Sequence, residues 1–248
     1  MISKCYATNY NSSPHKGNGN TAVILDPFLQ GMKEAGADIS LHYTDDLIIS
    51  ACRGDLRCMT HTPGTCIHDD DMRWLFPKME DADIWVLASP LYCDGVTGPM
   101  KTLMDRMVPL LQLFVELRED RCRHPLWTPK ERMIVLVSNC GFWENESFDP
   151  VIAQTKAFAK NVHAEYAGSI IRPHGPTLKA MIQKGLPVQD VLDSIRDAGF
   201  QLIDKGYMDE CTLNAISRPL KTRDAFLKDA NEIIQNIIDH AMIHSESL

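Results

Sequence analysis

The sequence lacks several features that would place it in a specialised class of protein. No apolar run among its 248 residues is long enough to span a membrane, and the N-terminus MISKCYATNY has no apolar segment of the kind that directs secretion. Basic residues are in the minority, with 25 Lys and Arg against 33 Asp and Glu, so the net charge of −8 argues against a general nucleic-acid-binding protein. There is also no internal repeat and no low-complexity tract. We therefore expect a cytoplasmic globular protein without nucleic-acid or membrane partners.

Cysteine is the residue type that stands out among those present. The chain has eight cysteines, and without an export signal these are better explained as reduced thiols, metal ligands or buried apolar residues than as a disulfide framework. Cys52, Cys58 and Cys66 fall within one stretch, ACRGDLRCMTHTPGTC, with Asp55 midway in the first gap. This stretch is a candidate metal-binding loop.

Strand-like and helix-like segments alternate along the first 175 residues. The patterns predict strands over residues 2–8, 37–43, 83–92, 132–142 and 166–173. They predict helices over about 25–36, 69–82, 98–111 and 151–164, with Gly36 as a C-terminal cap and Pro27 causing a kink or a late helix start. Residues 83–92 are almost continuously apolar, as in a central parallel strand. The order predicts an α/β fold, an open five-stranded parallel sheet with helices on both faces.

Two regions lie outside this plan. One is an insert at about residues 110–130, and the other is a helical tail that follows Pro176. One face of the last helix carries an apolar stripe formed by Phe226, Ala230, Ile233, Ile237 and Ala241. We expect one domain over residues 1–175, with residues 176–248 as a helical extension that packs on it or on a neighbouring subunit.

Three loops follow strands at the edge where parallel α/β sheets bind ligands. The first, Ser12–Thr21, is rich in Ser, Asn, Gly and Thr and precedes a helix, which suits a phosphate. It has neither the GK[ST] of a P-loop nor the spacing of GxGxxG. The second is SPLYCDGVTG, residues 89–98, and the third is SNCGFWEN, residues 138–145. Each alone fits an ordinary turn, but together they indicate a planar phosphorylated cofactor.

Several of these stretches, taken in order, carry a family resemblance. SPHKGNGNTA, the cysteine stretch, DDDM and ADIWVLASPLYCDGVTGPMKTLMDR resemble the NADPH-dependent FMN reductase-like iron–sulfur flavoproteins over about residues 1–175. The resemblance implies a flavodoxin-like fold, FMN as cofactor and a homodimer or homotetramer. By that resemblance the FMN phosphate is held by Ser13, His15, Asn20 and Thr21, with His15 where the family usually has arginine. The flavin ring is bordered by Pro90, Leu91, Tyr92, Cys93, Gly95, Cys140 and Gly141.

The same resemblance gives the cysteine stretch a meaning. Cluster-bearing members have C-x2-C-x2-C and a fourth cysteine before the DDM, which here correspond to Cys52, Asp55, Cys58 and Cys66. The expected centre is a 4Fe-4S cluster with Asp55 as a hard, labile ligand, or a 3Fe-4S cluster. Two alternatives remain open, zinc held by the three cysteines with Asp55 or His61, and a thiol loop without metal. The acidic run at residues 69–71 is interpreted as a helix cap.

The sequence therefore predicts an FMN-dependent oxidoreductase in which an iron–sulfur cluster relays single electrons. NAD(P)H, ferredoxin and quinones are the expected kinds of redox partner. No side chain is required as a general acid or base, since the chemistry belongs to the cofactor. Two alternatives remain, an NAD(P)H-dependent FMN or quinone reductase without a cluster, and a non-enzymatic flavodoxin-like electron carrier.

Overall fold

The centre of the molecule is a parallel sheet of five strands in the order β2-β1-β3-β6-β7. The structure, a computed structural model, describes residues 5–245. The strands are β1 (Tyr6–Asn11), β2 (Asp38–Tyr43), β3 (Ile84–Pro90), β6 (Met133–Asn139) and β7 (Glu165–Arg172). Counted along the chain, this is the 2-1-3-4-5 order of flavodoxin-like folds, so the predicted fold class is confirmed.

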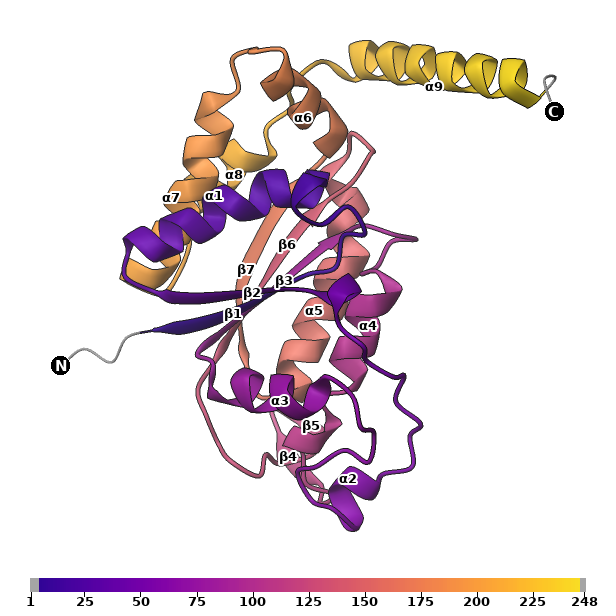
Figure 1. Cartoon of the computed structure of the whole chain (residues 1–248). Coiled ribbons are helices and arrows are strands. Elements are labelled where there is room, and N and C mark those ends of the chain that lie inside the picture. The colour runs from indigo at the N-terminus through magenta and orange to yellow at the C-terminus, as the bar shows by residue number, and fades with distance from the viewer. Residues whose placement is uncertain (1–4, 246–248) are drawn as a thin grey trace.

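Helices cover both faces of the sheet (Figure 1). One face carries α1 (Asn20–Glu34), α6 (Gly175–Gln183), α7 (Gln189–Lys205) and α8 (Glu210–Ser217). The other carries α3 (Met72–Asp81), α4 (Gly98–Asp105) and α5 (Asp149–Asn161). Strand β3 contributes side chains to the hydrophobic core on each face of the sheet. Ile84 and Val86 pack in the core with α1 and α7, and Trp85 and Leu87 pack in the core with α3, α4 and α5. Helices α6, α7 and α8, which follow residue 175, thus share a core with α1.

Two glycines allow α1 and α7 to approach each other closely. A Cβ atom at Gly31 would lie 1.8 Å from the carbonyl oxygen of Arg196, and one at Gly199 would lie 2.0 Å from that of Phe28. No side chain fits at such distances, so the backbones themselves are in contact. This contact anchors α7 on the helix that begins at the first strand-end loop.

The boundaries of several elements differ from those predicted. Strand β1 continues to Asn11, and residues 2–4 of the predicted strand lie outside the described residues. The predicted late start of the first helix is wrong, because α1 begins at Asn20 and runs through Pro27. Ile24, Leu25 and Phe28 are fully buried, each contributing about 1.5–3 kcal/mol, which offsets the roughly 3 kcal/mol cost of an internal proline.

The insert and the tail add elements that the patterns did not specify. Helix α4 ends at Asp105, and a 3-10 turn (Val108–Leu110) follows that contains Pro109. The insert forms an antiparallel hairpin of β4 (Glu116–Arg118) and β5 (Arg121–Arg123).

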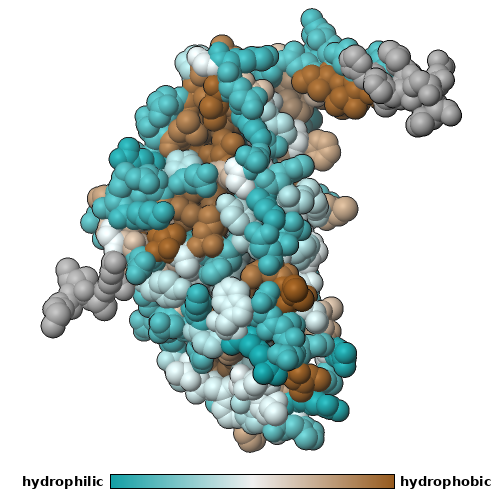
Figure 2. Space-filling view, in the orientation of Figure 1, coloured by the Kyte–Doolittle hydropathy of each residue, from teal (hydrophilic) through white to brown (hydrophobic). Residues whose placement is uncertain are grey.

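The last helix, α9 (Arg223–Ser245), projects away from the body of the protein (Figure 1). Ile233 and Ile237 of the predicted stripe are 59% and 63% exposed, and Figure 2 shows apolar side chains on the part of α9 that is not grey. Among the described residues no helix is both long and apolar enough to cross a membrane.

Candidate functional site

The first strand-end loop forms a cradle at the start of α1. A short 3-10 helix (Lys16–Asn18) leads to Gly19, which occupies the N-cap position and has no side chain to cap the helix. A Cβ atom at Gly19 would lie 2.6 Å from Ser13 Oγ, so any other residue at this position would displace that hydroxyl. The Ser13 and Thr21 side chains are buried beside it. The first backbone N–H groups of α1 and two hydroxyls therefore face a site suited to an anion.

Two lysines reach this loop from different directions. Lys16 of the loop itself forms ion pairs with Asp46 and, at 3.6 Å, with Asp45. Lys179, on α6, donates from its ammonium group to the backbone oxygen of Asn18. His15, the expected phosphate ligand, is exposed on the surface of the loop. The reasoning from sequence missed Lys179, because it lies 161 residues from its contact and in no recognisable motif.

The second loop turns sharply after β3. Tyr92 and Gly95 exchange two backbone hydrogen bonds of 3.0 and 3.1 Å, and Cys93 and Asp94 between them have φ values of +47° and +61°. This is the geometry of a two-residue hairpin turn. The Tyr92 ring is half exposed, so it is available to pack on a flat ligand.

The third loop is open on the side away from the core. A Cβ atom at Gly141 would meet no heavy atom within 4 Å, and Phe142 is exposed. Cys140 is buried, and burial raises the pKa of its thiol, so at neutral pH it stays protonated. The space beside Gly141 is therefore not filled by protein atoms.

Hydrogen bonds join the three loops into one site. Thr97 Oγ1 donates to the backbone oxygen of Ser12 at 3.3 Å, which links the first loop to the second. Asn139 accepts at its backbone oxygen from Leu91 N at 2.9 Å and donates from Nδ2 to Thr21 Oγ1 at 2.8 Å. The side chains and turns predicted for one cofactor are therefore brought to one edge of the sheet, with Thr97 and Asn139 as connecting residues that were not predicted.

The third loop is also fastened to the segment from which α9 emerges. Trp143 Nε1 donates to the backbone oxygen of Lys221 at 3.1 Å, and Arg223 pairs with Glu144 at 2.6 Å. Arg172 is fully buried and donates to the backbone oxygens of Ile216 and Arg218. The position of α9 is thus coupled to the candidate flavin loop.

The candidate metal ligands lie in a separate loop, between β2 and α3. Cys52, Asp55, Cys58 and Cys66 line one cavity of about 70 Å³, which His68 also borders. Burial raises the pKa of the Cys58 thiol, and the charges of Cys66, Cys52 and Asp55 raise it further. His61 hydrogen-bonds Thr60 and does not line this cavity.

The four candidate ligands share a cavity without converging on one point. Among the side chains that the structure describes, those of residues 5–239, no three His, Cys, Asp or Glu are arranged to hold a single metal ion. This finding gives no support to the zinc alternative. A cluster makes a looser demand, because its ligands bind different iron atoms.

The acidic run fixes the cysteine loop in place. Asp70 forms an ion pair with the buried Arg106, with two hydrogen bonds of 2.6 and 3.0 Å. Both side chains also bind the backbone of Ser50. Arg106 Nη1 donates to the Ser50 oxygen, and the Asp70 carboxylate accepts from the Ser50 N–H. Asp71 accepts from Ile48 N at 2.7 Å. Burial acts to raise the pKa of Asp70, but the hydrogen bonds and charge of Arg106 bring it down to about 2.

The acidic run also caps α3, as predicted, but the cap is Asp70 and not Asp71. Asp71, at the N-cap of α3, makes no capping hydrogen bond through its side chain, and capping is left to Asp70, which accepts from Met72 N at 3.2 Å. The main role of this run is to clamp the loop against α3 and α4.

Comparison with known sequences places this site in context. The family model of NADPH-dependent FMN reductases matches residues 10–141. An iron–sulfur flavoprotein of Archaeoglobus fulgidus is 36% identical over 97 residues, which are 39% of this chain and 43% of the relative. An iron–sulfur flavoprotein of Methanosarcina thermophila is 30% identical over 103 residues, 42% of this chain and 52% of the relative. The chain thus spans about half or less of the length of these relatives.

Solved structures align with a larger share of this chain than the related sequences do. An NAD(P)H:quinone oxidoreductase from Methanothermobacter marburgensis aligns with a TM-score of 0.57 and 16% identity over 81% of this chain and 98% of its own. An azoreductase from Bacillus anthracis aligns with a TM-score of 0.58 and 10% identity over 81% and 99%. At these identities the likeness concerns the fold alone.

Proposed function

Because the chain belongs to the NADPH-dependent FMN reductase family, we propose that it is an FMN-dependent oxidoreductase that takes electrons from NAD(P)H. The observation that carries the proposal is the joining of three strand-end loops around the uncapped start of α1. The acceptor would be a small molecule such as a quinone, or a protein such as a ferredoxin. The eight cysteines are all unpaired, which supports a reducing compartment such as the cytoplasm.

The residues of the three loops fit the parts of FMN. The hydroxyls of Ser13 and Thr21 and the N–H groups of α1 would hold the phosphate. Tyr92 and Phe142 would flank the ring, and the open space at Gly141 would admit its edge. When bound, FMN would supply the electron transfer, and the chain would position it and exclude water from one side.

The direct test is NADPH oxidation by the protein loaded with FMN, with a quinone as acceptor and air excluded. The reductase proposal expects steady turnover, which a carrier that works only with a partner protein would not show. Asn20→Ala combined with Thr21→Ala should release FMN and stop turnover, whereas Thr60→Ala, on the exposed cysteine loop, should retain both. Stoichiometric FMN in the double variant would place the phosphate elsewhere.

We propose further that the cysteine loop holds an iron–sulfur cluster, either 4Fe-4S or 3Fe-4S. The shared cavity of Cys52, Asp55, Cys58 and Cys66 supports this, as do relatives named iron–sulfur flavoproteins. Asp55 would be a hard oxygen ligand, which binds cluster iron less well than a thiolate. One of its oxygens also accepts a hydrogen bond from Arg57 N at 3.1 Å. The cluster-free reductase remains the alternative.

Replacing Asp55 by cysteine tests the cluster. Asp55→Cys, reconstituted without oxygen, should bind more iron and sulfide per chain than the parent and survive longer in air, because sulfur is the softer ligand. Cys58→Ala should lose the metal and keep FMN, and Cys122→Ser, an exposed cysteine in the insert, should change neither. If Asp55→Cys binds no iron or sulfide, the loop is not a cluster site.

A further inference from the structure

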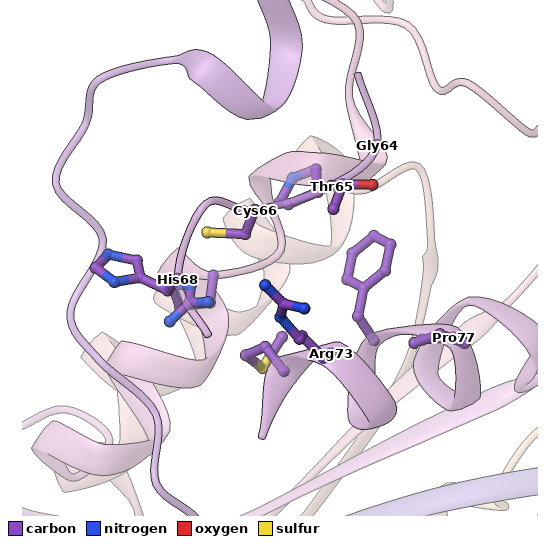
Figure 3. A pocket seen from close by; sticks show the side chains of 10 residues that line it. Gly64, Thr65, Cys66, His68, Arg73 and Pro77 are labelled. Carbon is purple, nitrogen blue, oxygen red and sulfur yellow. The ribbon is translucent and has the colours of Figure 1, made fainter. Parts of the chain in front are cut away.

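A second and larger cavity adjoins the cysteine loop. Its volume is about 350 Å³, and it lies between residues 64–68, the first turns of α3 and the end of α4 (Figure 3). That volume is within the range of small-molecule sites. It borders Cys66 and His68, which also border the smaller cavity of the cysteines. The lining residues are Gly64, Thr65, Cys66, His68, Met72, Arg73, Phe76, Pro77, Arg106 and Pro109.

The lining combines apolar walls with positive charge. Met72, Phe76, Pro77 and Pro109 offer flat apolar surface. The ten lining residues include two arginines and no carboxylate. Such a lining suits a ligand with an apolar body and a negative end.

One of the arginines, Arg106, is buried and already engaged. Arg106 is only 1% exposed, and its two terminal nitrogens are bonded to Asp70 and Ser50. Its Nε has no hydrogen-bond partner among the described residues, and neither does the buried Nε2 of His68. Both nitrogens are closed off from solvent, so neither is open to a ligand, and Arg106 contributes its positive charge from behind the wall of the cavity.

The other arginine is free to respond to a ligand. Arg73 pairs with Asp69 at 2.9 Å, but both side chains are largely exposed. Exposed pairs contribute only about 0–1 kcal/mol, so the guanidinium can turn its remaining N–H groups to an anion at little cost. Figure 3 shows the labelled Arg73, Cys66 and Thr65 side chains among those that line the cavity.

We propose that this cavity binds a small flat organic anion, of the class of an aromatic carboxylate. The ring would lie against Met72, Phe76 and Pro109, and the carboxylate would accept from Arg73, with the buried charge of Arg106 nearby. The bound ligand would contact Cys66 and would therefore be in a position to influence the cysteine loop. The inference goes beyond the proposed function and depends on neither FMN nor a cluster.

The test uses the full chain as purified, with benzoate as the probe and benzamide as its neutral analogue of the same shape. Saturation-transfer NMR should show benzoate binding at millimolar concentration or tighter, and benzamide at least fivefold more weakly. Arg73→Met should weaken benzoate binding about tenfold, through loss of one charge-assisted hydrogen bond. Lys78→Met, an equally exposed cation on α3 that does not line the cavity, should leave it unchanged.

Two more variants probe the cavity itself. Thr65→Phe places a ring at its rim and should abolish binding. His68→Leu removes an unpartnered buried nitrogen that does not contact the carboxylate, so it should fold at least as well as the parent and bind benzoate about as tightly. The proposal is overturned if benzoate does not bind saturably, if benzamide binds as well, or if Arg73→Met and Thr65→Phe bind benzoate like the parent.

Discussion

Lys179 and Lys16 both touch the first strand-end loop, yet their charges are not equally available. Lys16 is engaged by two aspartates, whereas Lys179 makes no ion pair among the described residues and contacts only a backbone oxygen. His15 stands where the related flavoproteins usually have arginine. We infer that the cation expected at position 15 is supplied instead from α6, a helix that the family model does not reach.

Lys179→Met should therefore lower FMN affinity about tenfold and leave riboflavin affinity unchanged, because only FMN carries the phosphate. Quenching of flavin fluorescence measures both. Lys179→Arg should restore FMN binding, and Lys184→Met, just beyond the end of α6, should have no effect. The salt dependence of FMN binding should also flatten in Lys179→Met. Equal losses for FMN and riboflavin would show that Lys179 only supports the loop.

At the scale of elements, the clamp between the cysteine loop and the helices rests on one buried ion pair. The side chains of Arg106 and Asp70 are 1% and 3% exposed, and together they hold Ser50. Removing one partner of a buried pair leaves an uncompensated charge, which costs about 3–5 kcal/mol. Both residues belong to the stretches that carry the family resemblance. These stretches therefore include the ion pair that supports the cysteine loop, in addition to the cysteines themselves.

Asp70→Asn should therefore lower the free energy of unfolding by about 3–5 kcal/mol, measured by urea denaturation at pH 7. Asp69→Asn, which breaks only the exposed pair with Arg73, should cost no more than about 0.5–1 kcal/mol. Folding lowers the pKa of Asp70 from its ordinary value of about 3.9, so the stabilisation is complete above that pH. It is lost as the pH falls through about 2. A parent protein whose acid unfolding matches that of Asp70→Asn would contradict this account.

The sheet was predictable from sequence because its signals are local. Residues 84–90 and 133–139 are apolar runs that only a doubly covered strand explains, and turn-forming residues follow each of them. The start of α1 was missed because a proline rule was applied without knowledge of the burial around Pro27. The contacts of Lys179, Asn139 and Gly199 join distant segments, and no local pattern encodes such pairings.

Considering the molecule as a whole, α9 exposes a row of large apolar side chains. Leu227, Ile234 and Ala241 are spaced seven residues apart, and Ala230 and Ile237 fall between them, as in a coiled-coil seam. Leu227, Ile234 and Ile237 are exposed, although a helix in a protein gains most of its stability by packing its apolar face against a partner. The segment before it is hydrogen-bonded to the third strand-end loop, and Arg223 at its start pairs with Glu144 of that loop, so a partner on α9 would also steady the proposed FMN site.

We therefore expect the protein to form at least a dimer in which α9 packs on a second copy of the chain. Sedimentation equilibrium at micromolar concentration should show the dimer, and Ile234→Glu combined with Ile237→Glu should convert it to a monomer, because charges in an apolar seam oppose association. Gln235→Glu combined with Asn236→Glu adds the same charge beside the seam and should leave the dimer intact. The monomeric variant should keep its FMN, since all three flavin loops come from one chain. A monomeric parent, or a dimer that survives the seam substitutions, would show that α9 serves another purpose.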